Sequence, residues 1–468
     1  MSRLVPTSPR ARRLLLLVAL VAGAAGARAD DAPRRRLPPF PRDEVVGAVT
    51  SLTELPATLG LPTIDPEYHT PLAGKRLELE LFGEHVVVPE RDRGKTMALT
   101  LGVAVFSPEI GAQSVVPFGA FYWRHIDEDR RLRAVLSGVV NEIDFAERFG
   151  RAGFEAVAHL DDYYIPIPSA QIIDNKDLDF TSLVWLWNSA WIGAGWRTPL
   201  PPGEVDNDLQ LQVGYVASYW YFTGREDFDD RQNVPPDTYV HGVHARVRLD
   251  AITRNLLELP HRGVAAGFDA EFLRRDRWED HGPIVPATGR HQFEERQTRD
   301  YTRLSAHVVV ATGLPFLSER HRFIGQVHGL WAPQGDLDRF NGFRVGGGPP
   351  PTEAADLQRS PWAGAMFDQY TVVDGVLASL EYRLEVLFFL FVHLRATLAS
   401  CRTPTYKGTL GPPGPYRFTR RSGTSYSAAI SSGFLWESSL YLEYSYDTGA
   451  LRAEEDGHSV LVLWSKSL

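Results

Sequence analysis

The fold is decided by residues Leu209–Phe222, which read LQLQVGYVASYWYF. Every second residue from the first onward is apolar or aromatic, while Gln210, Gln212 and Ser218 lie between them. Successive side chains of a β-strand point to opposite faces. The alternation therefore predicts a strand with one apolar wall and one mostly polar wall.

The same alternation recurs along the chain. The clearest further runs are 243–249, 264–272, 304–310, 376–384 and 440–446. Other runs lie near 96–106, 115–124, 131–145, 153–162, 322–331, 388–399, 424–435 and 459–467. The runs are about ten residues long, which is the length that a tilted strand needs to cross a bilayer, whereas strands of soluble domains are usually shorter.

The connections between the runs alternate in length. Leu435–Ser438 is short, whereas 224–237 and 274–300 are long and charged. Short turns at one end, long polar loops at the other and aromatic girdles, here including Trp331 and Trp464, are typical of outer-membrane barrels. We therefore expect an all-β protein of the bacterial outer membrane. Its fold should be a transmembrane, antiparallel, up-and-down β-barrel of about 16 strands with the apolar face toward lipid.

Two points stay open at this stage. A secreted all-β protein with one face of each sheet in water would show the same alternation, although strand length and loop asymmetry favour the barrel. The stretch Phe180–Trp196 is apolar at both parities, which fits a strand or a short buried helix, so residues 140–200 could hold two or four strands.

The first 29 residues are typical of a bacterial secretory signal peptide. Arg10, Arg12 and Arg13 precede an apolar run at 14–26, and Ala27-Arg28-Ala29 fits a cleavage site. An uncleaved anchor is the alternative, but the apolar run is too short to span a bilayer as a helix. Cleavage would remove five arginines and no acid. The net charge would change from -9 to -14, with 44 basic residues against 58 acidic ones.

We expect residues 30–95 to form a periplasmic arm or plug and residues 96–468 to form the barrel. Residues 30–95 begin rich in proline and contain a predicted strand near 77–88. The acidic balance argues against nucleic acid as a partner. The single cysteine, Cys401, rules out an intrachain disulfide and a Cys-based zinc site. We expect no metal and no other cofactor.

Short motifs in the last third of the chain occur in an informative order. Phe340–Gly348 reads FNGFRVGGG, and after a loop Leu377–Leu384 reads LASLEYRL. Upstream, Leu256–Gly263 reads LLELPHRG and precedes a strand. This order resembles the barrel of the Omp85 family (bacterial surface antigen D15 type), in which an F-x-x-G-G run opens the long sixth loop and an E-Y-R strand follows it. The similarity covers roughly residues 96–468.

The resemblance implies a function in outer-membrane assembly, or in transport of protein or lipid. Outer-membrane lipid, protein substrates and periplasmic assembly factors would be its partners. Family members usually carry periplasmic POTRA domains, and residues 30–95 do not look like one. The family's sixth loop also reaches into the lumen with an Arg-Gly-Phe/Tyr tip, where this chain reads Gln358–Trp362, QRSPW.

Arg344 and Arg359 are therefore expected to reach inward, with Glu381 or Glu443 as the acceptor. The full set of sixth-loop and lumen candidates is Arg344, Gly346, Gly347, Gly348, Arg359, Glu381, Arg383 and Glu443.

Charges on the inner parity, such as Arg246, Arg248, Asp269 and Glu271, could set ion selectivity or hold a loop. We favour mutual neutralisation between neighbouring strands. Catalytic motifs are not found: the glycine run lacks the Lys-Ser/Thr of a phosphate loop, and no G-x-S-x-G elbow occurs. We expect no enzymatic activity and no catalytic residue. A passive porin-like channel and an outer-membrane hydrolase are the alternatives.

Overall fold

The structure is a computed structural model that describes residues 68–468 with internal gaps. The gaps are 82–83, 111–112, 139, 151, 164–168, 174–175, 225–231, 279–281, 286–289, 292, 295–298, 315, 334–336, 339, 347–355, 366–369, 406–413, 416, 436–437 and 452–455. The predicted signal peptide and residues 30–67 lie outside the described residues, as do Gly347 and Gly348.

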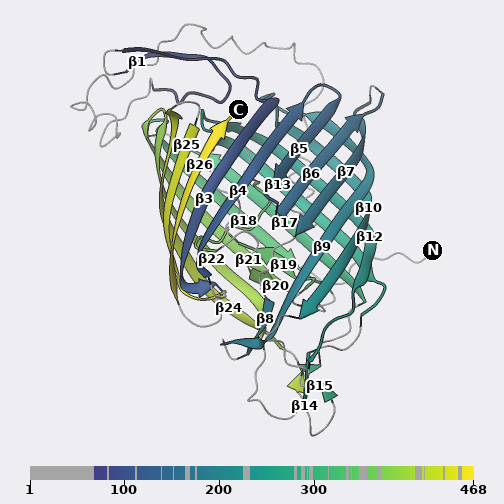
Figure 1. Cartoon of the computed structure of the whole chain (residues 1–468). Helices are drawn as coiled ribbons and strands as arrows, with labels where there is room; N and C mark the ends of the chain where they lie inside the picture. The colour runs from purple at the N-terminus through teal and green to yellow at the C-terminus, as the bar shows by residue number, and fades with distance from the viewer. Residues whose placement is uncertain are drawn as a thin grey trace. The chain divides into compact units, whose positions relative to one another are not determined.

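The alternating stretches form strands that close into one antiparallel barrel (Figure 1). Seventeen described strands follow one another around the ring. Because β7 and β8 pair with successive parts of β9, they share one position, which leaves sixteen. The last strand pairs with the first, with Val462 opposite Val103. The prediction of an all-β barrel of about 16 strands is confirmed.

The barrel strands are long and follow the chain in order. They are β3 (Lys95–Ile110), β4 (Gln113–Ile126), β5 (Arg130–Leu136), β6 (Val140–Arg148), β7 (Phe154–Tyr163) with β8 (Ser169–Ile173), β9 (Lys176–Pro199), β10 (Asp208–Gly224), β12 (Thr238–Arg254), β13 (Pro260–Arg275), β17 (Asp300–Thr312), β18 (His321–Trp331), β21 (Asp374–Leu387), β22 (Leu390–Thr405), β24 (Arg417–Leu435), β25 (Ser438–Asp447) and β26 (Gly457–Ser467).

Shorter strands lie outside the ring. They are β1 (Leu77–Leu81), β2 (Glu84–Val88), β11 (Gln232–Asn233), β14 (Gly282–Val285), β15 (Arg290–His291), β16 (Phe293–Glu294), β19 (Phe343–Val345), β20 (Tyr370–Val372) and β23 (Gly414–Pro415). No helix among the described residues is long and apolar enough to cross a bilayer.

The apolar parity of the strands faces outward, as predicted. On β10, Val213 and Tyr215 are 52% and 54% exposed, whereas their neighbour Val216 is buried. Outward-facing aromatic side chains lie near both ends of the strands, for example Trp123 and Trp464 at one end. An exposed apolar band of this kind is stable in lipid, and closure of the ring pairs every strand edge, as a membrane requires.

Two details of the strand prediction are wrong. The expected strand at 131–145 is two strands, β5 and β6, joined by a turn that contains Gly138 at φ 80°. The tryptophan-rich stretch belongs to the 24-residue strand β9. The region 140–200 therefore holds three ring positions rather than two or four. The stretch is apolar on both faces because its inward side chains, including Trp185 and Trp191, pack in the interior.

The two ends of the barrel differ, as the loop pattern predicted. Connections such as 127–129, 255–259 and 388–389 are short and lie at one end, which we call the turn end. The connections 225–237, 276–299 and 332–373 are long and join strands at the other end, which we call the loop end. The expected strand near 77–88 is a hairpin of β1 and β2, and it lies at the turn end (Figure 1).

Candidate functional site

The described part of the connection between β18 and β21 (332–333, 337–338, 340–346, 356–365 and 370–373) lies inside the barrel. These strands are the eleventh and twelfth of the ring, and barrels of 16 strands are too wide for wall side chains alone to fill. The described part of this connection fills that space with apolar side chains, among them Phe340, Val345 and Trp362. They pack in one cluster with inward-facing residues of the wall, among them Trp185 and Trp220. We call residues 332–373 the lumen loop.

A buried ion pair anchors the beginning of the lumen loop to the wall. Arg275 of β13 is fully buried and donates to both carboxylate oxygens of Asp338, at 2.6 and 3.2 Å. Its guanidinium also lies 3.8 Å from the ring centroid of Trp278. Asp338 in turn accepts from the backbone N–H of Phe340 at 2.8 Å, which fixes the turn that follows. The pair is bidentate, which compensates for burying both charges, although Arg275 Nε has no hydrogen-bond partner among the described residues.

The tip of the lumen loop, Asp356–Arg359, contacts β6 on the opposite side of the barrel and also strands from β12 to β18, near the base of the loop. Arg359 forms an ion pair with Glu142 of β6, and Gln358 accepts a hydrogen bond from Arg248 of β12. Leu357 packs against an apolar patch that includes Val309. The tip therefore holds polar and apolar contacts at once, and it ties the loop both to a distant strand and to strands near its own base.

The structure places Arg344 and Gly346 in the lumen loop. Arg344 donates from Nη1 to Thr371 Oγ1 at 2.7 Å and stacks over Trp185, 4.5 Å from its ring centroid. The Gly346 N–H donates to the Ser360 carbonyl at 3.3 Å, and the Gly346 carbonyl accepts from Trp362 at 3.2 Å. These contacts join the two halves of the loop to each other.

Glu381 and Arg383 face inward from β21, but they do not receive Arg359. Glu381 is 2% exposed and accepts from Arg383 and from Arg395, each at 2.7 Å, and from His393 at 3.0 Å. The expected acceptor was therefore wrong. Several strands carry a carboxylate at an inward-facing position. The sequence alone does not show which of these carboxylates pairs with the loop arginine.

Glu443 and the other inward charges are likewise paired within the wall. Glu443 accepts from Tyr441 at 2.5 Å, and Asp269 accepts from Arg246 at 3.2 Å. Arg303 donates to Glu271 at 2.6 Å. The Arg246–Asp269 and Arg303–Glu271 pairs join neighbouring strands, as expected for cross-strand neutralisation, whereas Glu443 contacts an uncharged tyrosine of its own strand.

One group of side chains has the hydrogen-bonding order of a hydrolase triad. His393 Nε2 lies 2.7 Å from Ser431 Oγ, and its Nδ1 lies 3.0 Å from Glu381 Oε1. Ser431 is 4% exposed and His393 3% exposed, so a substrate cannot reach the hydroxyl in this conformation. In a triad the Glu381 carboxylate would stabilise a protonated His393, but here the neighbouring arginines already pair with that carboxylate. The arrangement fits a structural network better than a nucleophile.

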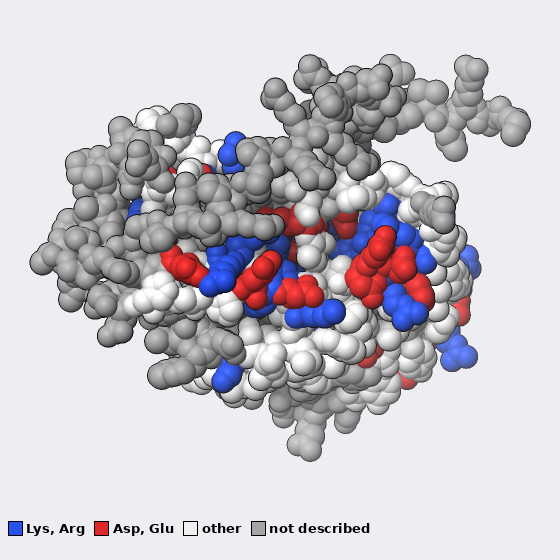
Figure 2. All heavy atoms as spheres, turned by 90° about the horizontal axis from the view of Figure 1, so that it is seen from above, with Lys and Arg blue, Asp and Glu red and all other residues white. Residues whose placement is uncertain are grey.

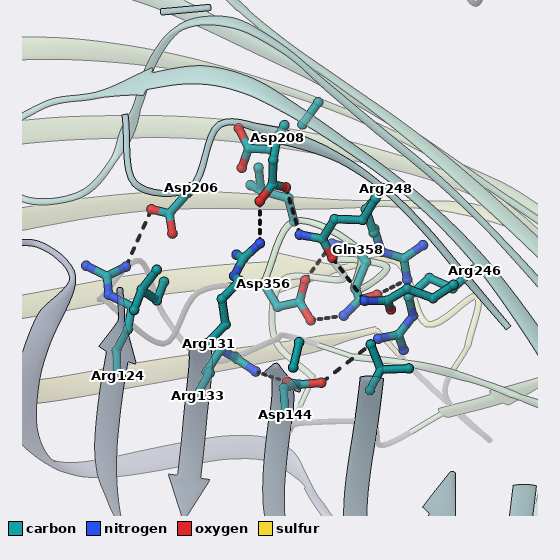
Figure 3. Close-up of a pocket in the computed structure, with 18 of the residues that line it drawn as sticks. Arg124, Arg131, Arg133, Asp144, Asp206, Asp208, Arg246, Arg248, Asp356 and Gln358 are labelled. Carbon is teal, nitrogen blue, oxygen red and sulfur yellow. Dashed lines mark hydrogen bonds and ion pairs between the residues drawn. The ribbon is translucent and has the colours of Figure 1, made fainter. Parts of the chain in front are cut away.

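A polar cavity of about 270 Å³ lies between the turn end and the loop tip (Figure 3). Its charged lining is Arg124, Arg131, Arg133, Arg246, Arg248, Arg254, Asp144, Glu155, Asp206, Asp208, Asp250, Glu258 and Asp356. Many of these groups pair with each other. Arg133 lies 3.2 Å from Asp144, Arg131 pairs with Asp208, and Asp144 lies 2.7 Å from His159. The cavity is therefore mixed in charge and suits polar solutes or water rather than one class of ion.

The residues that hold the loop in place could not be selected from the sequence. They are Glu142, Arg275 and Asp338, and the Arg359–Glu142 and Arg275–Asp338 pairs join residues that are far apart in the chain. One partial signal was present: Asp338 lies two residues before the Phe340 motif, and a carboxylate at the start of a loop that enters a barrel needs a cation from the wall.

The closed ring, the apolar exterior and the polar interior together define a membrane-spanning β-barrel with its own loop in the lumen. No protein-family model matches the chain, and neither does any curated protein. Among solved structures, it is similar to BamA from Haemophilus ducreyi lacking POTRA domains 1–3, with 11% identity, a TM-score of 0.45, and coverage of 82% of this chain and 72% of that one.

Two further solved structures are similar. CdiB from Acinetobacter baumannii has 10% identity and a TM-score of 0.43, over 85% of this chain and 64% of that one. Pseudomonas aeruginosa OpdL has 10% identity and a TM-score of 0.33, over 80% of this chain and 98% of that one. At these identities and scores the likenesses carry no argument about function, which rests on the geometry of this chain.

Proposed function

We propose that the protein is an outer-membrane barrel of the Omp85 type that acts in assembly at, or transport across, the outer membrane, with protein or lipid as cargo. The observation that carries the proposal is the lumen loop. It joins the eleventh and twelfth strands, lies inside the barrel, and pairs Arg359 at its tip with Glu142 of the wall. A passive pore needs an open lumen, whereas the described part of this loop occupies the lumen through apolar packing and a few ion pairs.

The orientation in the membrane follows from the two ends. Outer-membrane barrels have short turns in the periplasm and longer loops outside the cell. The turn end would then face the periplasm, together with both ends of the barrel segment at Lys95 and Ser467. Cargo or periplasmic assembly factors would meet the protein at the turn end, and outer-membrane lipid would cover the apolar band.

The proposal is tested by removing the gene and comparing the outer membrane before and after. Its protein and lipid composition and the set of surface and secreted proteins would be measured, with complementation by the wild type and by Arg359→Ala. We expect a defined protein or lipid class to be lost from the outer membrane or the cell surface, and to be restored by the wild type. An unchanged outer membrane, combined with steady conductance of the purified protein, would instead support a passive channel.

We also propose that the protein is not an enzyme, because the triad-like group found among the described residues is buried and its carboxylate is held by arginines. A fluorophosphonate probe labels activated serines. We expect no labelling of Ser431 in the folded protein in detergent. Labelling that disappears in Ser431→Ala would revive the outer-membrane hydrolase.

A further inference from the structure

The described segments before the barrel, residues 68–81 and 84–94, lie at the turn end and are fixed at several points. We call residues 68–94 the strap, of which residues 82–83 are not described. At its beginning, Tyr68 and Thr70 both donate to the carboxylate of Glu385 of β21, the latter at 2.6 Å. The Thr70 N–H also donates to Glu319 at 3.1 Å, and Arg320 lies 3.7 Å from the ring centroid of Tyr68.

The middle of the strap pairs with the turn between β12 and β13. Leu72 forms a β-bridge with Asn255, and the Leu256 N–H donates to the Pro71 carbonyl at 3.0 Å. Leu77 of β1 packs with Phe388, which lies in the turn between β21 and β22. These contacts explain why a two-stranded hairpin, which is marginal on its own, is ordered here.

The end of the strap carries an ionic cluster centred on Arg93. Its Nε donates to Glu258 Oε1 at 3.0 Å and its Nη2 to Oε2 at 2.6 Å, which is a bidentate pair. Its Nη1 donates to Glu204 at 2.7 Å and its Nη2 to Asp206 at 3.1 Å. The side chains of Arg93 and Glu258 are only 6% and 4% exposed. Arg91 adds a second contact to Glu258 at 2.8 Å.

These contacts bridge the mouth of the barrel. Arg93 precedes β3, the first strand of the ring, while Glu258 lies between β12 and β13, the eighth and ninth. Strands spaced about 4.8 Å apart and tilted by about 40° put opposite walls of a 16-strand barrel roughly 30 Å apart. The two residues can meet only because the strap and the turn both lean over the mouth. Figure 2, which looks onto this end, shows acidic and basic side chains interleaved there.

The backbone at Glu258 supports a specific role for its side chain. Glu258 has φ 61°, a conformation that favours glycine and costs a glutamate free energy. The strain is compensated by what the carboxylate does, because it is the acceptor on which Arg91 and Arg93 converge.

We propose that the strap closes the turn-end mouth of the barrel and that the Arg93–Glu258 pair is the latch that holds it closed. The polar cavity lies directly behind the latch, since Arg124, Asp206 and Glu258 belong to both the cavity lining and the cluster. The contacts across the mouth are ionic, so a charged partner can exchange for them. This inference rests on the proposed function, because it treats the lumen as a path for cargo. It adds a means by which the periplasmic entrance to that path is opened and closed.

Access to the cavity through the mouth can be measured with a thiol. In a Cys401→Ser background, Gln210→Cys places a single cysteine on the cavity lining. The purified protein in detergent is reacted with a small positively charged methanethiosulfonate, and the labelling rate is compared between latch variants. Both ends of the barrel are accessible in detergent, but the loop end is the same in every variant, so differences report the turn end.

Arg93→Ala removes the centre of the latch, and Glu258→Gln weakens it without changing its shape. We expect labelling to become about tenfold faster or more in Arg93→Ala, because Glu258, Glu204 and Asp206 all lose the buried cation that links them across the mouth, although Arg91 and Arg124 remain near Glu258. Labelling should rise less in Glu258→Gln. Arg76→Ala is the matched control, because Arg76 lies in the strap and pairs with Glu78 at the surface, where its side chain is 64% exposed. We expect the control to keep the wild-type rate.

Folding is checked by the shift in gel mobility on heating, and Glu258→Gln serves if Arg93→Ala fails to fold. Wild-type labelling rates in folded Arg93→Ala or Glu258→Gln would overturn the latch. An equal increase in Arg76→Ala would overturn it too, because the effect would then come from loss of charge in the strap. Neither result depends on cargo, so the latch can fail while the proposed function stands. Conversely, the labelling rates could support the latch while removal of the gene causes no assembly or transport defect. The proposed function would then fail while the latch stands.

Discussion

Arg359 shows how a single residue can fix a long loop inside a barrel. It carries the tip of the lumen loop, and its partner Glu142 is 8% exposed. Arg133 also lies 3.3 Å from Glu142, so the carboxylate keeps one cation when Arg359 is removed. A buried carboxylate in this position loses part of its compensation rather than all of it.

We predict that Arg359→Ala lowers the free energy of unfolding by about 1–3 kcal/mol, less than the full cost of an unpaired buried charge. Thermal or urea unfolding in detergent measures this. Arg274→Ala is the control, since the Arg274–Asp300 pair is exposed and surface pairs contribute little. Equal stability of Arg359→Ala and the wild type would show that the tip is not held by this pair.

Asp206 makes a pH prediction possible outside the membrane-spanning strands. Burial alone would raise its pKa, but the guanidinium groups of Arg254, Arg124 and Arg93 lower the pKa to about 2. An acid with a lowered pKa stabilises the folded state fully above its unfolded pKa of about 4, and the contribution is lost as the pH falls toward 2.

The melting temperature of the wild type should therefore include a component from Asp206 that is constant above about pH 5 and disappears between about pH 4 and pH 2. Asp206→Asn should melt lower at neutral pH, and the difference between the two proteins should shrink across that window. The prediction fails if the difference is the same at pH 7 and at pH 3.

At the scale of the element, strands were predictable where the alternation is local. The outward parity of β10 and β21 could be derived because each side chain's face depends only on its own strand. Residues 131–145 were misjudged because the turn at Gly138 interrupts the pattern for only a few residues. The stretch around Trp185 and Trp191 was ambiguous because its inner face is apolar, a consequence of the lumen loop that packs on it.

The site was less predictable than the strands. The motif around Gly346 pointed to the loop that does enter the lumen, and Arg359 was selected at its tip. Glu142 and Arg275 were not, since they lie on strands distant in sequence and resemble any other inward-facing charge. The strap contacts of Arg93 were hidden for the same reason.

The lumen loop makes an element-scale prediction through its anchor. Asp338→Asn leaves the fully buried guanidinium of Arg275 without a carboxylate, so the loop should detach more often. Trypsin should then cut after Arg344 at least about tenfold faster than in the wild type, where Arg344 is held by Thr371 and Trp185.

Asp300→Asn is the matched control, because Asp300 pairs at the surface and its loss should not change cleavage at Arg344. Fragments are identified by mass spectrometry. A wild type that is cut as fast as Asp338→Asn would mean that the loop is not held by this pair.

The outer wall gives a second element-scale prediction. Leu380 of β21 is 57% exposed on the apolar band. Leu380→Arg should cost about 2–4 kcal/mol for folding into lipid vesicles, because a cation on the lipid face near the middle of a bilayer is poorly solvated. Leu380→Ala should cost clearly less. Equal costs for the two variants would show that this face does not meet lipid.

At the scale of the whole molecule, the structure combines a wide barrel with segments of the same chain at both ends. The lumen loop packs inside the loop-end half through Phe340 and Trp362, and the strap crosses the turn end through Arg93. Between them lies the polar cavity of about 270 Å³. Apolar packing dominates the contacts of the lumen loop, and ion pairs dominate those of the strap. The two closures should therefore respond to different conditions, the strap to charge and the lumen loop to displacement by a larger partner.

If the chain's own lumen loop occupies the membrane-spanning barrel, the loop should limit the passage of ions, which conductance in planar bilayers measures. Leu330 lies opposite Gly375, so a short turn of about four residues can join β18 to β21 in place of the loop. We predict low or intermittent conductance for the wild type and, in an Arg93→Ala background that also opens the latch, a large, stable conductance for the loop-deleted variant. A large, stable conductance for the wild type that the deletion leaves unchanged would contradict occupation of the lumen by the loop and identify a passive channel.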